Sequence, residues 1–553
     1  MRFASSPSSV SGAPSRRLAH YQGLFFDEFV PDSAWIRELG IVRLPPLAEK
    51  TVFVVQGEMH PHPDVHGLEA GSLGADFLLD GRCVATLRHL RPGPFRVRLS
   101  AGPAGIQSGA ILGVRLRGTG VTNLLALLGR VTAGWPLTGA LQRFRRQNKN
   151  RQFRLVRIET EAGEAVFDFS NRHSPFSAEF ARRGVRLGLN LAGFLTADLG
   201  IGESARCMAL AADAAGIALA LIDLKLPCRN RRGDPAYAGR LQEENPYPVN
   251  VVHLDPPASR DLEHHHPGFC RGKYNIAYWA WELPEFPDAW LPSCDYFDEI
   301  WCPSEFTREA IAFKSPIPVL AMPHSISFAL PAEPIAALRA RFGLPPETFL
   351  FLTLFDLNSY VERKNPRAVL AAFRQSGLAG AGAALVIKVQ NAAGNPQDLA
   401  ELQAAARDLP GTILITETLL RAEIYALEAA CDCFVSLHRA EGFGLAVAEC
   451  MLLGKPVIST NWSATAEYVT AENGCPVRAP LVVLERNYGP YARGQVWADP
   501  DVGDAARWMR ALFSDRALAG RLGVAARATM IERFDPAVIG ARYRRRLEAI
   551  AGW

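Results

Sequence analysis

The sequence predicts an α/β protein with two doubly wound domains that face each other across a cleft, preceded by a β-sandwich. Three observations lead to this prediction. The 553 residues are too many for a single hydrophobic core. From about residue 186 onward, apolar runs alternate with Ala-rich or amphipathic segments, which is typical of βαβ units and a parallel sheet. Before residue 180, short alternating runs with turn signals take their place.

The composition excludes several classes of protein. Apolar residues make up 48% and charged residues 21%, as in an ordinary globular enzyme. The net charge of +4 is too balanced to indicate a nucleic-acid binder. No apolar run reaches the roughly 18 residues that a membrane span needs, so we expect any membrane contact to be peripheral. The ten scattered cysteines contain no CxxC motif and fit a reducing cytosol, which predicts a cytoplasmic protein, with the inner face of the membrane as its peripheral contact.

The N-terminal part divides into two predicted segments. Residues 1–24 have no apolar core of a signal peptide, so we expect a disordered tail. Residues 25–178 are predicted to form the β-sandwich, with a hairpin at Asp80-Gly81 and few helical patterns apart from a short candidate at 122–131. The basic stretch 142–157 is interpreted as a solvated loop and strand edge, with an anionic-surface patch as the alternative.

The remaining chain divides into two halves and a final helix. Residues 186–320 are predicted to form the first Rossmann-like domain, on the acceptor side. The Pro-rich connector KSPIPVLAMPHSISFALPAEP leads to the second, residues 321–530, which would bind the donor. Residues 531–553 are predicted to form a C-terminal helix that crosses back to the first half. Ligands of such folds bind beyond the carboxyl ends of the strands.

Basic residues follow the first strand of the second half. In FDLNSYVERKNP, Asn365 can cap the next helix and Pro366 suits its first position, so Arg363 and Lys364 lie beside a helix N-terminus. Two cations at a positive helix end suit a diphosphate, and a surface pair without a ligand is the alternative. Lys388, at the end of the second strand, is a weaker candidate for lining a nucleotide pocket.

The stretch EGFGLAVAECMLLGKPV places two glutamates, Glu441 and Glu449, around a glycine-rich helix start. The backbone N–H groups of Phe443, Gly444 and Leu445 begin that helix without internal partners, which favours a phosphate seat. Glu449 is the only charge in an apolar helix and needs hydrogen-bond donors there, either a structural partner or a ribose diol.

The spacing of the two glutamates argues against a glycoside hydrolase. On one continuous helix, eight residues would separate them by about 12 Å along the axis and about 80° around it. The carboxylates of a hydrolase lie roughly 5 to 9.5 Å apart. Because Glu441 precedes the helix, its distance is not fixed, but the pattern better suits a grip on the two ends of an extended ligand.

These motifs resemble the E-x7-E signature of the retaining glycosyltransferases of family 4, which have the GT-B architecture. RKNP resembles the basic donor-phosphate motif of that family, PVLAMPHSIS resembles its interdomain connector, and the resemblance covers about residues 186 to 550. It implies that Glu441 contacts donor-sugar hydroxyls, that Glu449 binds the ribose and that Arg363 and Lys364 neutralise the diphosphate. YWAWELPEFPDAW resembles a mannosyltransferase-like subgroup of bacterial polysaccharide assembly.

Two departures from the family pattern concern the site. Phe355-Asp356 replaces the usual Gly-Arg, with Asn358 and Ser359 following as donor-side candidates, so Arg363 is the candidate substitute for the missing arginine. YWAWEL stands where many members have a histidine, which leaves Glu282 as a candidate contact for acceptor or sugar, or as a structural cap of the next turn. Gly202 in DLGIGES resembles a family loop near the donor phosphate.

Together these features predict a hexosyltransferase that moves a sugar such as mannose from a nucleotide-sugar to a glycan or lipid-linked acceptor in cell-surface polysaccharide synthesis, and the resemblance implies the retaining type. The alternatives are a non-catalytic carbohydrate-binding protein and a nucleotide-sugar epimerase. We expect no cofactor and no metal: His60, His62 and His66 have metal-like spacing, but the interleaved prolines favour a loop, and His264 to His266 are expected in a solvated loop.

Overall fold

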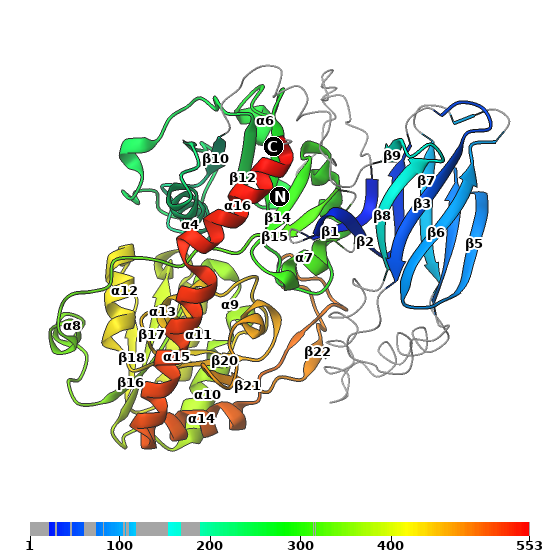
Figure 1. Cartoon of the computed structure of the whole chain (residues 1–553). Helices are drawn as coiled ribbons and strands as arrows, with labels where there is room; N and C mark the ends of the chain where they lie inside the picture. The colour runs from blue at the N-terminus through cyan, green and yellow to red at the C-terminus, as the bar shows by residue number, and fades with distance from the viewer. Residues whose placement is uncertain are drawn as a thin grey trace.

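The computed structural model of the chain describes residues 21–27, 30–44, 47–59, 73–80, 82–102, 105–106, 110–117, 153–167, 188–312, 314–315 and 317–551. Figure 1 shows three bodies: an N-terminal β region and two α/β domains, with the C-terminal helix running between the latter two. The histidines of HPHPDVH, the helix expected at 122–131 and most of the basic stretch 142–157 lie outside the described residues.

The N-terminal region is an antiparallel sheet. Its nine strands are hydrogen-bonded in the order β5-β4-β7-β2-β8-β3-β6, with β1 on β2 and β9 on β8. The strands are β1 (Tyr21–Asp27), β2 (Val30–Arg43), β3 (Val52–Met59), β4 (Leu73–Leu79), β5 (Arg82–Leu90), β6 (Gly93–Ser100), β7 (Ile111–Arg117), β8 (Phe153–Thr160) and β9 (Ala165–Phe167). Because only two residues separate β5 from β6, the two ends of this path must approach each other, and the sheet folds over one apolar core.

Two details of this region refine the sequence predictions. Asp80 has a positive φ of 48° at the tip of the β4–β5 hairpin, where the sequence predicts the turn. β1 begins at Tyr21, four residues inside the segment that the sequence assigns to the tail, because it pairs with β2.

The first α/β domain has a parallel sheet in the order β11-β10-β12-β13-β14-β15. The strands are β10 (Leu189–Gly193), β11 (Leu219–Asp223), β12 (Val249–His253), β13 (Tyr274–Tyr278), β14 (Glu299–Cys302) and β15 (Val319–Ala321). The helices are α4 (Gly200–Ala214), α5 (Pro256–Ser259), α6 (Leu262–His265) and α7 (Glu305–Ala312). Every residue of β10, β12 and β13 is buried, as expected for strands covered on both faces.

The second α/β domain has the strand order β18-β17-β16-β19-β20-β21, again parallel. The strands are β16 (Phe349–Asp356), β17 (Ala383–Gln390), β18 (Thr412–Ile415), β19 (Cys433–Ser436), β20 (Val457–Thr460) and β21 (Cys475–Val477), with a separate ribbon of β22 (Leu481–Val483) and β23 (Val496–Ala498). The helices are α8 (Ile335–Arg341), α9 (Val361–Lys364), α10 (Pro366–Ser376), α11 (Pro396–Ala406), α12 (Arg421–Ala430), α13 (Leu445–Leu452), α14 (Val502–Ser514) and α15 (Arg516–Phe534). Strand order reverses between β16 and β19, the place where such sheets bind ligands.

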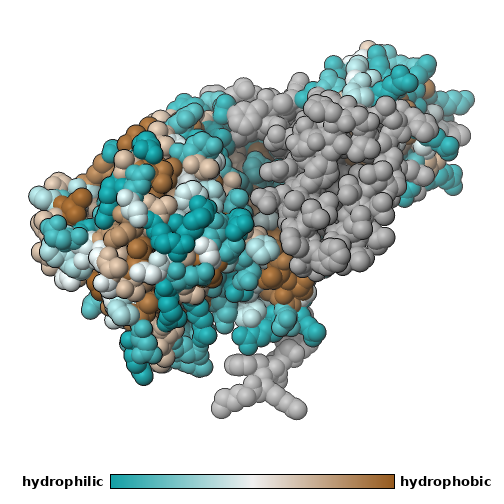
Figure 2. Space-filling model, turned by 90° about the horizontal axis from the view of Figure 1, so that it is seen from below, coloured by the Kyte–Doolittle hydropathy of each residue, from teal (hydrophilic) through white to brown (hydrophobic). Residues whose placement is uncertain are grey.

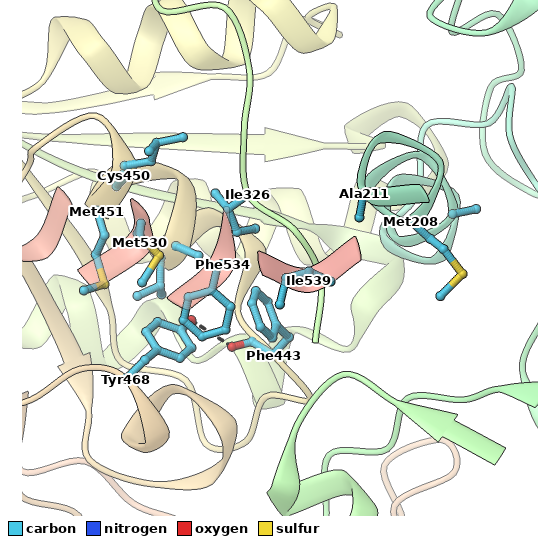
Figure 3. Packing of buried hydrophobic residues seen from close by; sticks show 14 of the residues in the cluster. Met208, Ala211, Ile326, Phe443, Cys450, Met451, Tyr468, Met530, Phe534 and Ile539 are labelled. Carbon is cyan, nitrogen blue, oxygen red and sulfur yellow. Dashed lines mark hydrogen bonds between the residues drawn. The ribbon is translucent and has the colours of Figure 1, made fainter. Parts of the chain in front are cut away.

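Two chain segments connect the α/β domains. The Pro-rich connector contributes β15 to the first sheet before it crosses, because Val319 to Ala321 pair with Ile300 to Cys302. The last helix, α16 (Pro536–Ala551), returns from the second domain and packs on α4, where a Cβ on Gly540 would lie 2.1 Å from the carbonyl oxygen of Ala211. Figure 3 shows Phe534 and Ile539, on either side of the α15–α16 junction, packed near Ile326 of the connector.

Three further features concern the surface, the helices and the cysteines. On the face seen in Figure 2, apolar side chains of the described residues occur in patches between hydrophilic ones. Among the helices of the described part, none has the length and apolar character needed to cross a bilayer. All ten cysteines are free thiols.

Candidate functional site

The basic pair and the first glutamate of the motif form one cluster. Lys364 Nζ lies 2.5 Å from Glu441 Oε1, and Arg363 Nη1 lies 3.2 Å from Glu441 Oε2. Burial opposes ionisation of Glu441, but Lys364 and Arg363 prevail and hold its pKa at about 2. The residues that the sequence assigns to sugar and to diphosphate are therefore paired with one another.

The local backbone explains how α9 delivers both cations. Tyr360 and Asn365, which flank α9, both have positive φ angles, of 60° and 56°. Asn365 precedes α10 as predicted, but its side chain donates to the carbonyl of Leu437, 3.0 Å away, and makes no capping hydrogen bond. The expected cap is therefore wrong, because Asn365 ties the loop after β16 to the loop after β19 and so sets the spacing of the cluster.

Arg363 is buried and only partly satisfied. Its Nη1 donates to the carbonyl of Ala440 at 2.9 Å, while its Nε has no hydrogen-bond partner. Burial lowers the pKa of Lys364 beside it, and Arg363 lowers that pKa further, although Glu441 acts in the opposite direction. A buried, unpaired donor costs roughly 1–3 kcal/mol, so an anion that reached Nε would be stabilised there.

Gly444 shapes the start of α13. Its φ is 93°, and a Cβ there would lie 2.6 Å from Thr465 Cγ2. The hydroxyl of Tyr468 donates to the carbonyl of Phe443 at 2.8 Å, which Figure 3 shows as a dashed line. Phe443 points its ring into the core shared by the two halves, so this residue can offer a ligand only its backbone groups; Leu445 is the first residue of the helix.

Glu449 is almost completely buried and paired with Arg421 of α12. Burial raises its pKa to about 7, with Arg421 lowering it and Glu203 of the first domain raising it further. The sequence left a structural partner and a ribose diol as alternatives. The structure provides a structural partner, the guanidinium of Arg421, and no signal in the sequence indicated that the first residue of α12 would face α13.

The other donor-side candidates surround the end of β16. Asn358 accepts from Asn395 at 2.9 Å, and Ser359 ends the short turn that follows. Asp356 accepts a hydrogen bond from Asn230 of the first domain at 3.1 Å. Lys388 is buried, which lowers its pKa to about 8, and its ammonium donates to Val389 and Gln390 next to it.

Gly202 lies in the first turn of α4. A Cβ there would lie 2.5 Å from the carbonyl oxygen of Phe194 and 2.7 Å from that of Ala197. The glycine thus lets α4 pack closely on the loop after β10. The next residue, Glu203, is 3.4 Å from Arg421 of the donor domain, so the start of α4 faces the donor side.

Glu282 brings a carboxylate from the first domain to the cluster. Its Oε1 lies 3.9 Å from Arg363 Nη2, and its Oε2 accepts from the Tyr491 hydroxyl at 3.1 Å. Trp281 beside it is 1% exposed and packs among aromatic rings. Tyr491, whose hydroxyl orients Glu282, carried no sequence signal.

Further contacts between the halves were also missed by sequence reasoning. Ser304 Oγ donates to the carbonyl of Gly442 at 2.7 Å. Glu467 accepts the backbone N–H of Phe306 at 2.7 Å and that of Glu305 at 3.2 Å, at the N-terminus of α7. These contacts hold the loops after β19 and β20 against the start of α7.

Other polar features lie apart from this cluster. Among the described residues, no group of three or more His, Cys, Asp or Glu side chains is arranged to hold a metal ion. A cavity of about 620 Å³ in the first domain is lined in part by Asp223, Lys225 and His266. His264 and His265 belong to the end of α6 and are exposed, whereas His266 is half-buried.

Comparison with known proteins supports the fold. Residues 338–528 match the family model described as Glycosyl transferases group 1. Anabaena Alr3699/HepE in complex with UDP and glucose has a TM-score of 0.50 and 14% identity over 66% of this chain and 100% of that one. A glycosyltransferase from Rickettsia africae ESF-5 has a TM-score of 0.49 and 13% identity over 66% of this chain and 99% of that one. No curated protein sequence matches the chain.

At such identities the structural likeness concerns the fold. The GT-B architecture predicted from the sequence, two Rossmann-like domains with an additional N-terminal antiparallel β region, is confirmed. The second α/β domain carries the glycosyl transferases group 1 match, and that match contains Arg363, Lys364, Glu441 and Glu449.

Proposed function

We propose that this protein is a glycosyltransferase that moves a sugar from a nucleotide-sugar donor to a glycan or lipid-linked acceptor. The observation that carries the proposal is the cluster of Arg363, Lys364 and Glu441 at the carboxyl ends of β16 and β19. It lies in the segment that matches the glycosyl transferases group 1 family. The Anabaena protein with the same fold holds UDP and glucose, which supports a nucleotide-sugar as donor.

The subsites follow from the order of groups along the motif. Glu441 accepts hydrogen bonds from the sugar, the amides of 443–445 and the two cations receive the diphosphate, and Glu449 binds the ribose. As the bond between the anomeric carbon and the phosphate oxygen breaks, charge develops on the leaving diphosphate. Lys364, Arg363 and the start of α13 stabilise that charge, so the scheme includes no metal or other cofactor.

The remaining features of the proposal concern partners and outcome. The acceptor hydroxyl forms the new bond to the anomeric carbon with retention of configuration and gives its proton to the departing diphosphate, and Glu282 contacts the acceptor or the sugar. Mannose is the first donor sugar to test, with cell-surface polysaccharide as the product and the cytoplasm, with peripheral membrane contact, as the place. These assignments rest on the motifs in the sequence.

The proposal is tested by substitution of Lys364. We expect Lys364→Ala to lower kcat by about 10²–10³-fold, because it removes a preorganised charge from the leaving group. The measurement is nucleoside diphosphate release from UDP- and GDP-sugars in the presence of an oligosaccharide or lipid-linked acceptor. Lys455→Ala is the matched control, since Lys455 is another buried lysine of this domain and donates to the Ala429 carbonyl.

Two alternatives give different results in the same assays. A non-catalytic carbohydrate-binding protein would bind glycan but neither UDP nor GDP in calorimetry. A nucleotide-sugar epimerase would change the donor sugar in the absence of any acceptor. Turnover of Lys364→Ala at the wild-type rate would show that the cluster is not the donor site.

A further inference from the structure

Arg421 lies between carboxylates of the two α/β domains. It begins α12 of the donor domain, pairs with Glu449 of α13 and has its Nε 3.4 Å from Glu203 Oε2 on α4 of the first domain. The side chains of Glu203 and Glu449 are 13% and 4% exposed, so both ion pairs are largely shielded from water. A pair in such an environment is screened far less than a surface pair.

Each neighbour of Arg421 is itself fixed in place. Arg206 donates to Glu203 at 2.9 Å and anchors its own guanidinium on the carbonyls of Leu195 and Ala197. On the other side, the Arg421 guanidinium lies 4.9 Å from the ring centroid of Tyr425. That ring stacks on Phe328 of the connector, with centroids 3.7 Å apart. Arg421 therefore touches both domains directly and the connector through one ring.

Further buried carboxyl groups surround Arg421 and Arg206. Glu428 lies about two turns after Arg421 on the same face of α12. It is fully buried, and neither of its carboxylate oxygens has a hydrogen-bond partner. Burial and the neighbouring Glu449 raise its pKa well above the usual range. Arg206 pairs with Glu203 and Asp234, and Arg421 pairs with Glu203 and Glu449, so Glu203 is the carboxylate that the two guanidinium groups share.

Arg421 is not fully satisfied in this arrangement. Although its Nε is close to Glu203, that buried nitrogen makes no hydrogen bond. Native proteins rarely leave a buried donor unpaired, and such a group calls for an explanation. The Arg421 guanidinium is shared between Glu449 and Glu203. A ligand hydroxyl that bonded to the Glu449 oxygen in its place would leave the guanidinium free to pair fully with Glu203.

We propose that Arg421 is a positioning residue that couples binding of a nucleoside diphosphate at Glu449 to closure of the two domains through Glu203. The proposal rests on the proposed function, because it takes Glu449 as the ribose contact. When the ribose diol bonds to Glu449, Arg421 turns onto Glu203 and holds α4 against the donor domain. Because such coupling is reciprocal, any free energy that Glu203 contributes to closing the domains must also strengthen nucleotide binding, although Glu203 belongs to the other domain.

A double-mutant cycle tests the coupling. Glu203→Gln, Arg421→Met and the double variant are titrated with UDP and with GDP by calorimetry. We expect each single variant to weaken binding of the preferred nucleotide by about 5–50-fold, and the double variant to bind no more weakly than Arg421→Met. Asp213→Asn is the matched control, since Asp213 is also on α4 but pairs with Arg240 within the first domain, and it should bind as the wild type does.

A second readout separates coupling from a merely structural role. Small-angle scattering should show that UDP or GDP makes the wild-type protein more compact and leaves the dimensions of Arg421→Met and Glu203→Gln unchanged. Wild-type nucleotide affinity of Glu203→Gln, or effects of the two substitutions that simply add, would overturn the proposal. If Arg421→Met does not fold, the nucleotide affinity and the scattering of Glu203→Gln alone still test the coupling.

The outcomes also distinguish this proposal from the proposed function. Glu449→Gln should weaken nucleotide binding whether or not the domains are coupled. If the wild type binds neither UDP nor GDP, the proposed function fails. If the wild type binds, and Glu449→Gln weakens binding while Glu203→Gln does not, the donor site stands and only the coupling through Arg421 is wrong.

Discussion

The two α/β domains share a parallel-sheet plan but present different chemistry where they meet. In the donor domain, the loops after β16 and β19 bring together Arg363, Lys364 and Glu441. In the first domain, the chain after β13 enters a cluster of buried aromatic rings around Trp279 and Trp281. The contacts from that side include the hydrogen bond from Ser304 to the Gly442 carbonyl and two carboxylates, Glu203 and Glu282, that pair with arginines of the donor domain.

This difference indicates how the two α/β domains contribute differently to ligand recognition. A charged cluster that is fixed before the ligand arrives can stabilise a developing charge without reorganisation. A packed apolar wall has little to offer a charged ligand, but it holds shape and excludes water. We therefore interpret the donor domain as the source of electrostatic stabilisation and the first domain as the part that closes and shapes the site.

The largest effect that would test this division is on the contact between the domains at Glu467. Burial and the nearby Glu305 raise its pKa to about 7, against the backbone N–H groups of α7 that lower it. A carboxyl whose pKa is raised in the folded state stabilises the fold below its unfolded pKa, and this stabilisation is lost as the pH rises through about 7. The free energy of unfolding of the wild type should therefore fall between pH 4.5 and pH 7.5. We expect this fall to be smaller in Glu467→Gln, by roughly 1–3 kcal/mol.

The measurement is urea unfolding at both pH values. Glu423→Gln is the control, because Glu423 also accepts a backbone N–H at a helix start but within one domain and in an exposed position. An unchanged pH slope in Glu467→Gln would mean that the contact at α7 does not depend on this carboxyl.

An effect of similar size concerns the rigidity of the donor domain at Gly444. Alanine there would be strained by the φ of 93° and would meet Thr465 Cγ2 at 2.6 Å. Gly494 has a similar φ of 88° but open space around its Cβ position, so Gly494→Ala isolates the backbone strain. We expect Gly494→Ala to cost about 1 kcal/mol and Gly444→Ala about 2–3 kcal/mol, measured as the shift in unfolding midpoint. Equal losses would show that the start of α13 can move to accommodate a side chain.

The two halves also differ in how far their sequences predicted their structure. Apolar runs such as those of β16, β17 and β19 identify buried parallel strands, and RAEIYALEAA corresponds to α12 from Arg421 to Ala430. The sequence did not predict β15, which lies inside the Pro-rich connector. Three residues are too few to show a periodic pattern, and only their pairing with β14 makes them a strand.

The site was predictable where function depends on short, local motifs. The positions of Arg363, Lys364 and Glu441 follow from the loop and helix signals around them, and the structure brings the three together. The partners of Glu449 and Glu282 were not predictable, because Arg421 and Tyr491 approach them from segments whose local pattern carries no sign of that contact. Tertiary packing across the domain interface sets these pairs.

The smallest effect we expect is on Glu282, and it tests the division of labour most directly. Glu282 is the carboxylate that the first domain places 3.9 Å from Arg363, and Tyr491 holds its other oxygen. If the first domain only shapes the site, Glu282→Gln should lower kcat by about 10-fold and leave the KM for the donor unchanged, because the amide keeps the oxygen that accepts from Tyr491. Tyr491→Phe should reproduce part of that loss by freeing the Glu282 side chain. Steady-state kinetics with donor and acceptor varied separately would measure both. A loss in Glu282→Gln as large as that in Lys364→Ala would instead place a charge essential to transfer on the first domain, and the contrast between the two halves would no longer hold.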